Sequence, residues 1–257
     1  MGRANYDRMR RSSRLIAAFA VVFGLGACAG PVVVTPVSTG TGAPQSAVPL
    51  QAPEQPGPAA IRAKARSFLR VIDRVEPVAE QECQKWTAGR VNCDFQLVID
   101  DRPGQPPNAF QTEDKAGRPL IGFTPALIVS AQNEDELAFI LSHEAAHHIA
   151  GHLARTQDNA RLGAAVLGGL IGAAGGDAQS VRAAQDLGAA VGGRAYSKDF
   201  ELEADAMGAR IAIAAGYDPV RGAEFFRRVP DPGDAFLGTH PPNARRMEIV
   251  RRVAEGG

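Results

Sequence analysis

The placement of its histidines constrains this chain most. Four of the five lie at positions 143, 147, 148 and 152, and the fifth is His240. The first two belong to the sequence His143-Glu-Ala-Ala-His147. On a helix, residues four apart differ by about 40° in azimuth, so both imidazoles point the same way and can bind one Zn²⁺ at about 2.0–2.1 Å. The fold must then bring further ligands to that helix.

Glu144 lies about 100° round the helix from His143, where it can reach a zinc-bound water without binding the metal. Zinc lowers the pKa of such a water to about 7. The carboxylate can then take its proton as the water attacks a peptide carbonyl, and pass it to the leaving amine. Chance histidines on a polar face are the alternative. The apolar stripe Leu137, Ile140 and Leu141 instead predicts a core helix, where histidines need polar partners.

The third ligand must come from elsewhere. A pattern with another histidine six positions after His147 fails, because Leu153 stands there. On a continuous helix His152 lies about 180° from His143. We expect His148 and His152 to face solvent or a neighbouring helix, without a metal role.

A second predicted helix contains the sequence Glu201-Leu-Glu-Ala-Asp205. Glu201 and Asp205 share one face, and Glu203 points about 200° away from Glu201. We expect Glu201 to bind zinc and Asp205 to accept the spare N–H of a ligand histidine, which fixes its tautomer. A solvated acidic helix is the alternative, but the Ala-rich opposite face and the upstream histidines favour a ligand.

These patterns resemble metallopeptidase family 48, the gluzincins of the HtpX and CAAX prenyl protease type, which include a periplasmic outer-membrane assembly protease. The resemblance covers roughly 108–250 and extends to Gly216-Tyr-Asp-Pro219 and to Thr239-His-Pro-Pro242, followed by Arg245 and Arg246. It implies an α+β, mainly α, gluzincin-like zinc metallopeptidase domain, with a small antiparallel sheet beside the H-E-x-x-H helix.

The resemblance also implies the roles of the site residues. One Zn²⁺ per chain would be held by His143, His147 and Glu201, with Glu144 as general base and Asp205 bonded to a ligand. By its match to the His-Pro motif of the family, His240 would be a transition-state donor or a regulatory extra ligand, and a structural loop histidine is the alternative.

One segment departs from the family. Residues 111–119 stand where the family usually has Pro-Gly-Gly and a strand, which leaves open the form of the substrate-pairing edge strand. Elsewhere the hydrophobic pattern predicts helices over 60–75 and 200–215, from Asn133 to about Gly151, from Pro219 and after Pro242, and strands over 94–99, 108–112 and 119–123. The Gly/Ala-rich segment Leu162–Gly176 predicts a helix packed through small residues or a mobile lid.

The N-terminal segment predicts export. Residues 1–27 contain five arginines and a 13-residue apolar run, too short to span a membrane but typical of a signal peptide. The run ends in Leu25-Gly-Ala-Cys28, which resembles the lipobox of bacterial lipoproteins and implies acylation of Cys28. Ala29, in place of aspartate, favours the outer membrane. An ordinary signal peptide, and hence a secreted soluble protease, is the alternative.

A tether would follow the anchor. Residues 28–58 are rich in proline and carry one charge, Glu54, as in a semi-extended linker, so we expect the metallopeptidase domain over 59–257. Outside the cytoplasm Cys83 and Cys93 would form a disulfide, with two unpaired thiols as the alternative.

The sequence thus predicts a zinc endopeptidase, lipid-anchored on the periplasmic side of a bacterial membrane. Its partners would be unfolded or misassembled envelope proteins and, through Cys28, the lipid bilayer. The 28 basic and 28 acidic side chains balance, which argues against a nucleic-acid partner. A non-hydrolytic envelope assembly factor or chaperone that holds a partner with the same zinc fold is the alternative.

Overall fold

The computed structural model describes residues 57–231 and 240–256. The predicted signal peptide, Cys28 and the tether up to residue 56 lie outside the described residues. The first helix begins at Pro58, one residue before the predicted domain boundary. None of the helices in the described ranges is long and apolar enough to span a membrane.

Helix α1 (Pro58–Thr87) is longer than the predicted 60–75. It continues through Pro77, although proline removes one backbone hydrogen bond inside a helix. Its buried side chains recur every three or four residues, so one apolar stripe persists on both sides of the proline and faces the core. These side chains are Phe68, Val71, Val75, Ala79 and Cys83.

The sheet is mixed, and the expectation of a wholly antiparallel sheet is wrong. Strands β2 (Ala109–Glu113) and β3 (Pro119–Phe123) form an antiparallel hairpin. Strand β1 (Gln96–Ile99) pairs in parallel with the other edge of β3, giving the order β1-β3-β2. The buried β3 is therefore central, and β2 is left at an edge. Residues 111–119, where the sequence departs from the family, complete β2, form the hairpin turn and begin β3.

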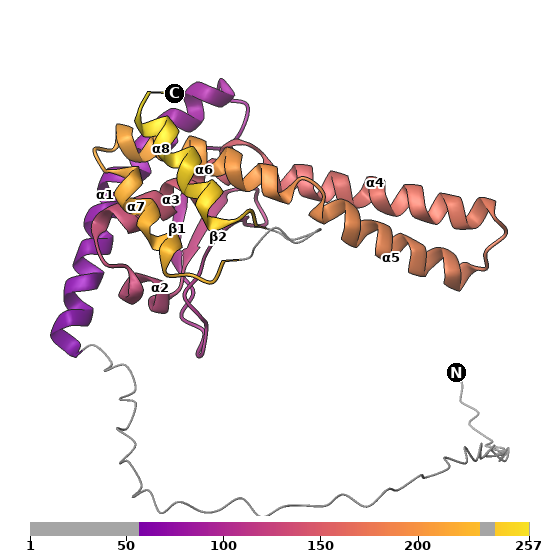
Figure 1. Cartoon of the computed structure of the whole chain (residues 1–257), viewed down its shortest axis with the longest axis horizontal. Helices are drawn as coiled ribbons and strands as arrows, with labels where there is room; N and C mark the ends of the chain where they lie inside the picture. The colour runs from indigo at the N-terminus through magenta and orange to yellow at the C-terminus, as the bar shows by residue number, and fades with distance from the viewer. Residues whose placement is uncertain (1–56, 232–239, 257) are drawn as a thin grey trace, which may run out of the picture. The chain divides into compact units, whose positions relative to one another are not determined.

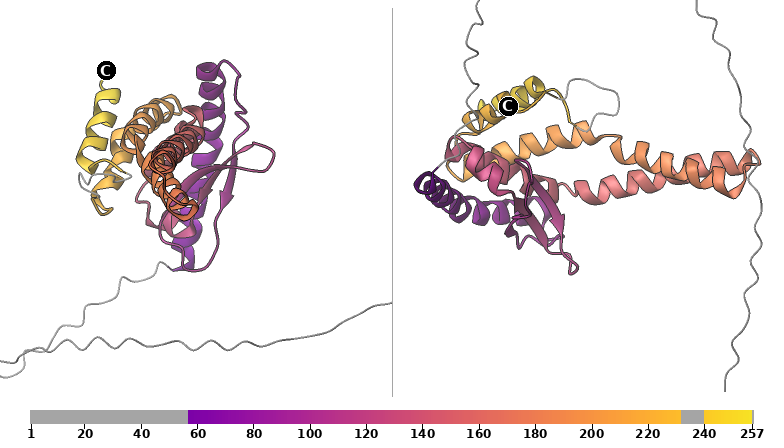
Figure 2. Two further views of the ribbon diagram at one scale, coloured as in Figure 1. Left: turned by 90° about the vertical axis from the view of Figure 1, so that its right-hand side faces the viewer. Right: turned by 90° about the horizontal axis from the view of Figure 1, so that it is seen from below.

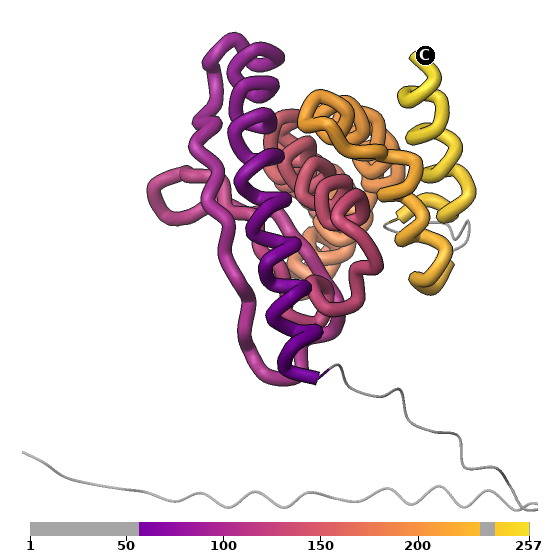
Figure 3. The backbone as a smooth tube through the Cα atoms, turned by 90° about the vertical axis from the view of Figure 1, so that its left-hand side faces the viewer, coloured from indigo at the N-terminus to yellow at the C-terminus, as the bar shows by residue number. Residues whose placement is uncertain are grey.

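Three helices form the centre of the domain. Helix α3 (Glu134–Ile149) packs between α1 and α6 (Ser197–Ala214), as Figure 3 shows. Asn133, where the sequence predicts the start of a helix, caps α3 through a hydrogen bond from the Glu136 backbone N–H. Apolar side chains of α1, β3, α3 and the short α2 (Pro125–Ser130) make up the larger core cluster.

A smaller cluster lies on the other side of α3. It joins α3 and α6 to α7 (Pro219–Ala223), the 3₁₀ helix η1 (Glu224–Arg227) and α8 (Asn243–Ala254). Its buried members are Phe139, Ala209, Ala223, Phe226, Met247 and Val250. Helix α7 begins at Pro219 and α8 follows Pro242, both as predicted, and Asp218 caps α7. The centre of α3 is thus buried against both clusters.

Helices α4 (His152–Ala173) and α5 (Ala178–Arg194) form an antiparallel hairpin that extends away from the other elements (Figures 1 and 2). The prediction of a close contact through small residues is confirmed. A Cβ added to Gly163 would lie 2.0 Å from the Gly188 carbonyl oxygen, and one added to Gly188 would lie 2.1 Å from that of Gly163. Glycine at both positions lets the two backbones approach this closely.

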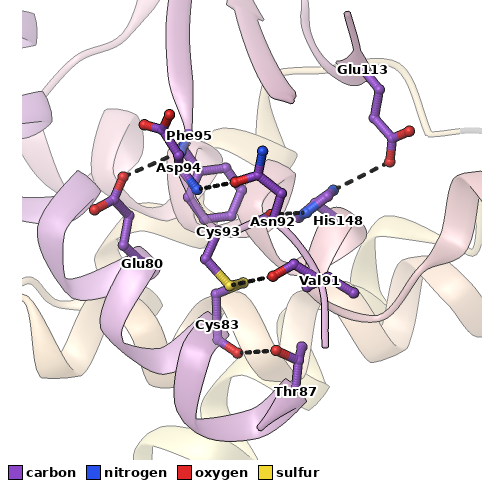
Figure 4. The surroundings of a disulfide bond; sticks show 10 residues. All are labelled: Glu80, Cys83, Thr87, Val91, Asn92, Cys93, Asp94, Phe95, Glu113 and His148. Carbon is purple, nitrogen blue, oxygen red and sulfur yellow. Dashed lines mark hydrogen bonds and ion pairs between the residues drawn. A yellow bond between two sulfur atoms is a disulfide. The ribbon is translucent and has the colours of Figure 1, made fainter. Parts of the chain in front are cut away.

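The structure joins Cys83 and Cys93 in a disulfide, as predicted (Figure 4). Their Cα atoms are 5.8 Å apart, within the usual range for such a bond. The disulfide ties the end of α1 to the segment before β1, and both cysteines are buried. It therefore fixes the sheet to the long helix.

Candidate metal centre

Helix α3 presents His143 and His147 one turn apart. Their Nε2 atoms are 3.0 Å apart, and both side chains line one pocket. His143 is buried and His147 is partly exposed towards that pocket. The two imidazoles therefore point the same way, as predicted.

Helix α6 brings Glu201 to the two histidines. Its carboxylate oxygens lie 3.3 Å from the Nε2 atom of His147 and 3.6 Å from that of His143. Two ligand atoms that are each about 2.0–2.1 Å from a tetrahedral zinc ion lie roughly 3.3 Å apart. All three separations are near that value, so the residues fit a zinc ion. Among the described residues, this trio is the group found with metal-binding spacing.

The nitrogen of His143 that faces away from Glu201 has its own partner. Nδ1 lies 3.0 Å from the Asp205 carboxylate, which is fully buried. Because a carboxylate only accepts, it holds the proton on Nδ1 and leaves Nε2 free to bind a metal, as predicted.

The sequence predicts no role for Arg246. In the structure its guanidinium donates two hydrogen bonds of 2.7 Å to the Asp205 carboxylate and so holds it in place. Arg246 also lies 3.3 Å from the Glu201 carboxylate and 4.0 Å from the centre of the Phe226 ring. The available sequence signal was its place in the resemblance, four residues after Pro242. Arg246 thus connects α8 to the side chains that orient and form the metal centre.

These buried charges shift one another's pKa values. Burial lowers the pKa of His143, but hydrogen bonds to Asp205 and Glu201 outweigh burial and raise it to about 10. Burial raises the pKa of Glu201, yet hydrogen bonds from the neighbouring histidines hold it well below its usual range. The pKa of Asp205 is lowered against burial, mainly by the charge of Arg246. In the metal-free protein His143 is therefore protonated at neutral pH.

This proton predicts how metal binding depends on pH. A ligand histidine must be neutral, so zinc must displace the proton of His143. We expect release of about one proton per zinc at pH 7.5, and an apparent affinity that rises about tenfold per pH unit up to about pH 10. In the metal-free fold, the contribution of His143 to stability is fully present below pH 6.5 and is lost as the pH rises towards 10. Titration calorimetry in two buffers of different ionisation enthalpy measures the released proton, and equal heats would contradict the expectation.

Glu144 and His240 complete the pocket. Its volume is about 460 Å³, and both side chains line it together with His143, His147 and Glu201. The Nδ1 atom of His240 lies 3.1 Å from the Glu201 carboxylate, and its side chain is half exposed. The structure therefore brings together all five residues that the sequence predicts for the pocket.

The comparisons with known proteins agree with this geometry. A family model described as peptidase family M48 matches residues 68–254. The chain belongs to peptidase family M48. Peptidases of this family are zinc-dependent, and the trio His143, His147 and Glu201 could hold such an ion. A Vibrio cholerae protein named "Putative beta-barrel assembly-enhancing protease" is 35% identical over 141 residues, which are 50% of this chain and 29% of that protein. The match thus spans less than a third of that relative's length.

Two further histidines of this M48 chain were expected to face solvent or a neighbouring helix. Both His148 and His152 are buried, and His152 contacts the neighbouring helix α6 through Phe200 and Glu203. His148 Nε2 lies 2.7 Å from the carbonyl oxygen of Asn92, beside the disulfide, and its Nδ1 lies 3.7 Å from the Glu113 carboxylate (Figure 4). His148 thus joins α3 to the segment before β1 and to the edge strand β2.

His152 instead turns back towards the metal centre. Its Nδ1 atom lies 2.9 Å from Nδ1 of His147, and its Nε2 atom lies 3.2 Å from Glu203. Burial lowers the pKa of His152 to about 4. His152 does not lie opposite His143 because the helix is not continuous between the two residues. Gly151 has φ = +66°, which ends α3 and gives α4 a new direction from its first residue. The glycine at the predicted end of this helix was the sequence signal that the chain changes direction before His152.

Proposed function

We propose that this chain is a zinc-dependent endopeptidase of the bacterial cell envelope. It would cleave unfolded or misassembled envelope proteins as part of protein quality control. Membership of the M48 family and the name of the Vibrio cholerae relative support this assignment. The observation that carries it is the trio His143, His147 and Glu201, spaced so that it could hold a metal ion, in one pocket with the side chain of Glu144.

The residues of the pocket divide the chemistry. A bound zinc ion would act as a Lewis acid that polarises the peptide carbonyl and lowers the pKa of a water molecule. Glu144 accepts the proton of that water and delivers it to the leaving amine. Glu201 cannot serve as this base, because its carboxylate is engaged by His143, His147 and His240. The Nδ1 atom of His240 approaches from the pocket side, where a donor would stabilise the negative charge on the attacked carbonyl.

The edge strand β2 gives the pocket a place for an extended substrate. Ala109, Phe110 and Gln111 of β2 line the same pocket as Glu144. Because β2 is an edge of the sheet, a polypeptide can add to it as a further strand through main-chain hydrogen bonds. Such pairing needs a segment free of other structure, which an unfolded protein offers and a folded one does not.

The proposed location rests on the sequence before the described residues. Acylation of Cys28 would anchor the chain on the periplasmic side of a membrane, the outer membrane being favoured. The predicted tether over residues 28–58 would let the domain reach substrates near the bilayer. Incorporation of radioactive palmitate in the producing bacterium, lost in Cys28→Ala, tests the anchor.

Cleavage of unfolded casein by the purified zinc-loaded protein tests the activity. We expect cleavage that stops when a chelator removes the metal and returns when zinc is restored. Casein fragments separate peptide-bond hydrolysis from binding alone, and a folded protein of similar size should stay intact. Casein left uncut by the zinc-loaded wild type and by zinc-loaded His240→Ala alike would contradict the endopeptidase.

The non-hydrolytic assembly factor remains the second candidate, and the position of His240 favours it. With its Nδ1 atom 3.1 Å from Glu201, His240 is placed to cap the metal as an extra ligand. His240→Ala separates the two functions. If His240 is a cap, its removal uncovers or increases casein cleavage, whereas loss of a transition-state donor decreases it. Absence of cleavage with and without His240 would favour the assembly factor.

A further inference from the structure

We infer that His152, held by Glu203 and Arg155, is a positioning residue for the metal ligand His147. The inference rests on the metal binding of the proposed function, and it adds a second orienting network to the one formed by Asp205. His152 would fix which nitrogen of His147 carries the proton, and thereby which nitrogen faces the metal.

The hydrogen-bond directions follow from the last acceptor in the network. Glu203 lies 3.2 Å from the Nε2 atom of His152 and, as a carboxylate, can only accept. The proton of His152 is therefore on Nε2, and its Nδ1 atom carries a lone pair. That lone pair faces the Nδ1 atom of His147 at 2.9 Å and accepts the hydrogen bond that this atom donates. With a metal ion bound, His147 would then offer its unprotonated Nε2 atom, which lies 3.3 Å from Glu201 and 3.0 Å from Nε2 of His143.

The surroundings of His152 hold its ring in one orientation. The side chain is 3% exposed, and its ring stacks on Phe200 with 4.6 Å between centres and 12° between planes. Arg155 donates to the Glu203 carboxylate at 2.9 Å, and its guanidinium lies 4.2 Å from the centre of the Phe200 ring. The acceptor of His152 is thus itself fixed, as an orienting network requires.

The two ligand histidines then have equivalent supports. His143 donates to Asp205, which Arg246 holds. His147 donates to His152, which passes its other hydrogen bond to Glu203. Both carboxylates belong to α6, four residues and two residues after Glu201. One helix therefore supplies a metal ligand and both of the carboxylates that orient the other two ligands.

His152→Phe tests this inference with zinc affinity as the readout, measured by competition with a chromophoric chelator. Phenylalanine keeps a planar ring against Phe200 but cannot accept a hydrogen bond from His147. Losing a partner of a ligand histidine typically weakens metal binding 10–100-fold, and we expect a loss in that range. His148→Phe is the matched control, because it removes a buried histidine that bonds to Asn92 instead of to a ligand.

Two further measurements distinguish positioning from packing. Glu203→Ala should weaken zinc binding in the same direction, and adding it to His152→Phe should produce little further loss, because both changes break one network. Nitrogen NMR of the zinc-loaded protein should show His147 bound through Nε2 in the wild type and through a mixture of nitrogens in His152→Phe. Glu203→Gln keeps an accepting oxygen and should recover part of the affinity lost in Glu203→Ala.

Zinc affinity of His152→Phe within twofold of wild type would overturn the inference, as would an equal loss in His148→Phe. Because the readout is metal affinity, failure of the protein to cleave casein would count against the proposed function and leave this inference standing. A wild-type chain that binds no zinc would overturn both.

Discussion

Glu144→Gln should decrease the rate of casein cleavage by about 10²–10⁴-fold, the usual contribution of a positioned general base. Glutamine has nearly the same volume and still fits the pocket, but it cannot accept a proton from the attacking water. Glu144 does not belong to the ligand trio, so the zinc content should equal that of the wild type. Cleavage rate and bound zinc are measured on the same preparation.

A matched control comes from an exposed glutamate. Glu248 on α8 pairs with Arg252 at the surface, where such pairs contribute little. Glu248→Gln should therefore change neither the zinc content nor the cleavage rate. Unreduced cleavage by a zinc-loaded Glu144→Gln protein would remove Glu144 as the base and with it the proposed mechanism.

The positions of the candidate ligands and of Glu144 were predictable because their spacings lie within single helices. The spacing of His143 and His147, and of Glu201 and Asp205, fixes a common face whatever surrounds each helix. The resemblance to the family then predicted that the two helices bring these side chains to one zinc ion. The predictions of where these side chains lie agree with the structure because α3 and α6 are regular through the residues concerned.

Predictions from the sequence were wrong where the direction of the chain depends on a single residue, or where the structure depends on packing or pairing with a distant segment. The reversal at Gly151 moves His152 from the far side of a helical wheel to a contact with His147. Strand β1 pairs in parallel because it joins the hairpin at β3, whereas in the same direction it would be antiparallel to β2. Alternation within a strand does not say which side of the hairpin it joins. Continuation of α1 through Pro77 likewise depends on its packing against α3, which compensates for the lost backbone hydrogen bond.

Helix α6 carries the proposed ligand Glu201 and the carboxylates of Glu203 and Asp205 that would orient the two histidines of α3. The geometry of the site therefore depends on the distance between α6 and α3. Gly208, seven residues after Glu201, lies where the two helices touch. A Cβ added there would be 2.9 Å from both the N and Cα atoms of His143. These are backbone atoms and cannot move aside as a side chain would. The absence of a side chain at Gly208 therefore sets the separation of His143 from Glu201 and Asp205.

Gly208→Ala should therefore weaken zinc binding and casein cleavage together. The added methyl group must push α6 away from α3, and a displacement of about 1 Å can decrease an enzymatic rate about 10²-fold. Overpacking of this kind should also lower the free energy of unfolding by about 1–3 kcal/mol, against the gain in helix propensity that alanine normally brings. Chelator competition, casein cleavage and urea unfolding measure the three effects.

Gly169→Ala is the matched control for helix propensity. Gly169 also lies within a helix, α4, but a Cβ added there meets no atom within 4 Å. We expect it to raise the free energy of unfolding by up to about 1 kcal/mol, with zinc affinity and cleavage unchanged. If Gly208→Ala behaved like this control, the close contact of α3 and α6 would not set the geometry of the metal ligands. Both variants keep the same candidate ligands, so a loss of zinc affinity in Gly208→Ala alone would show that the separation of α3 and α6 controls zinc binding.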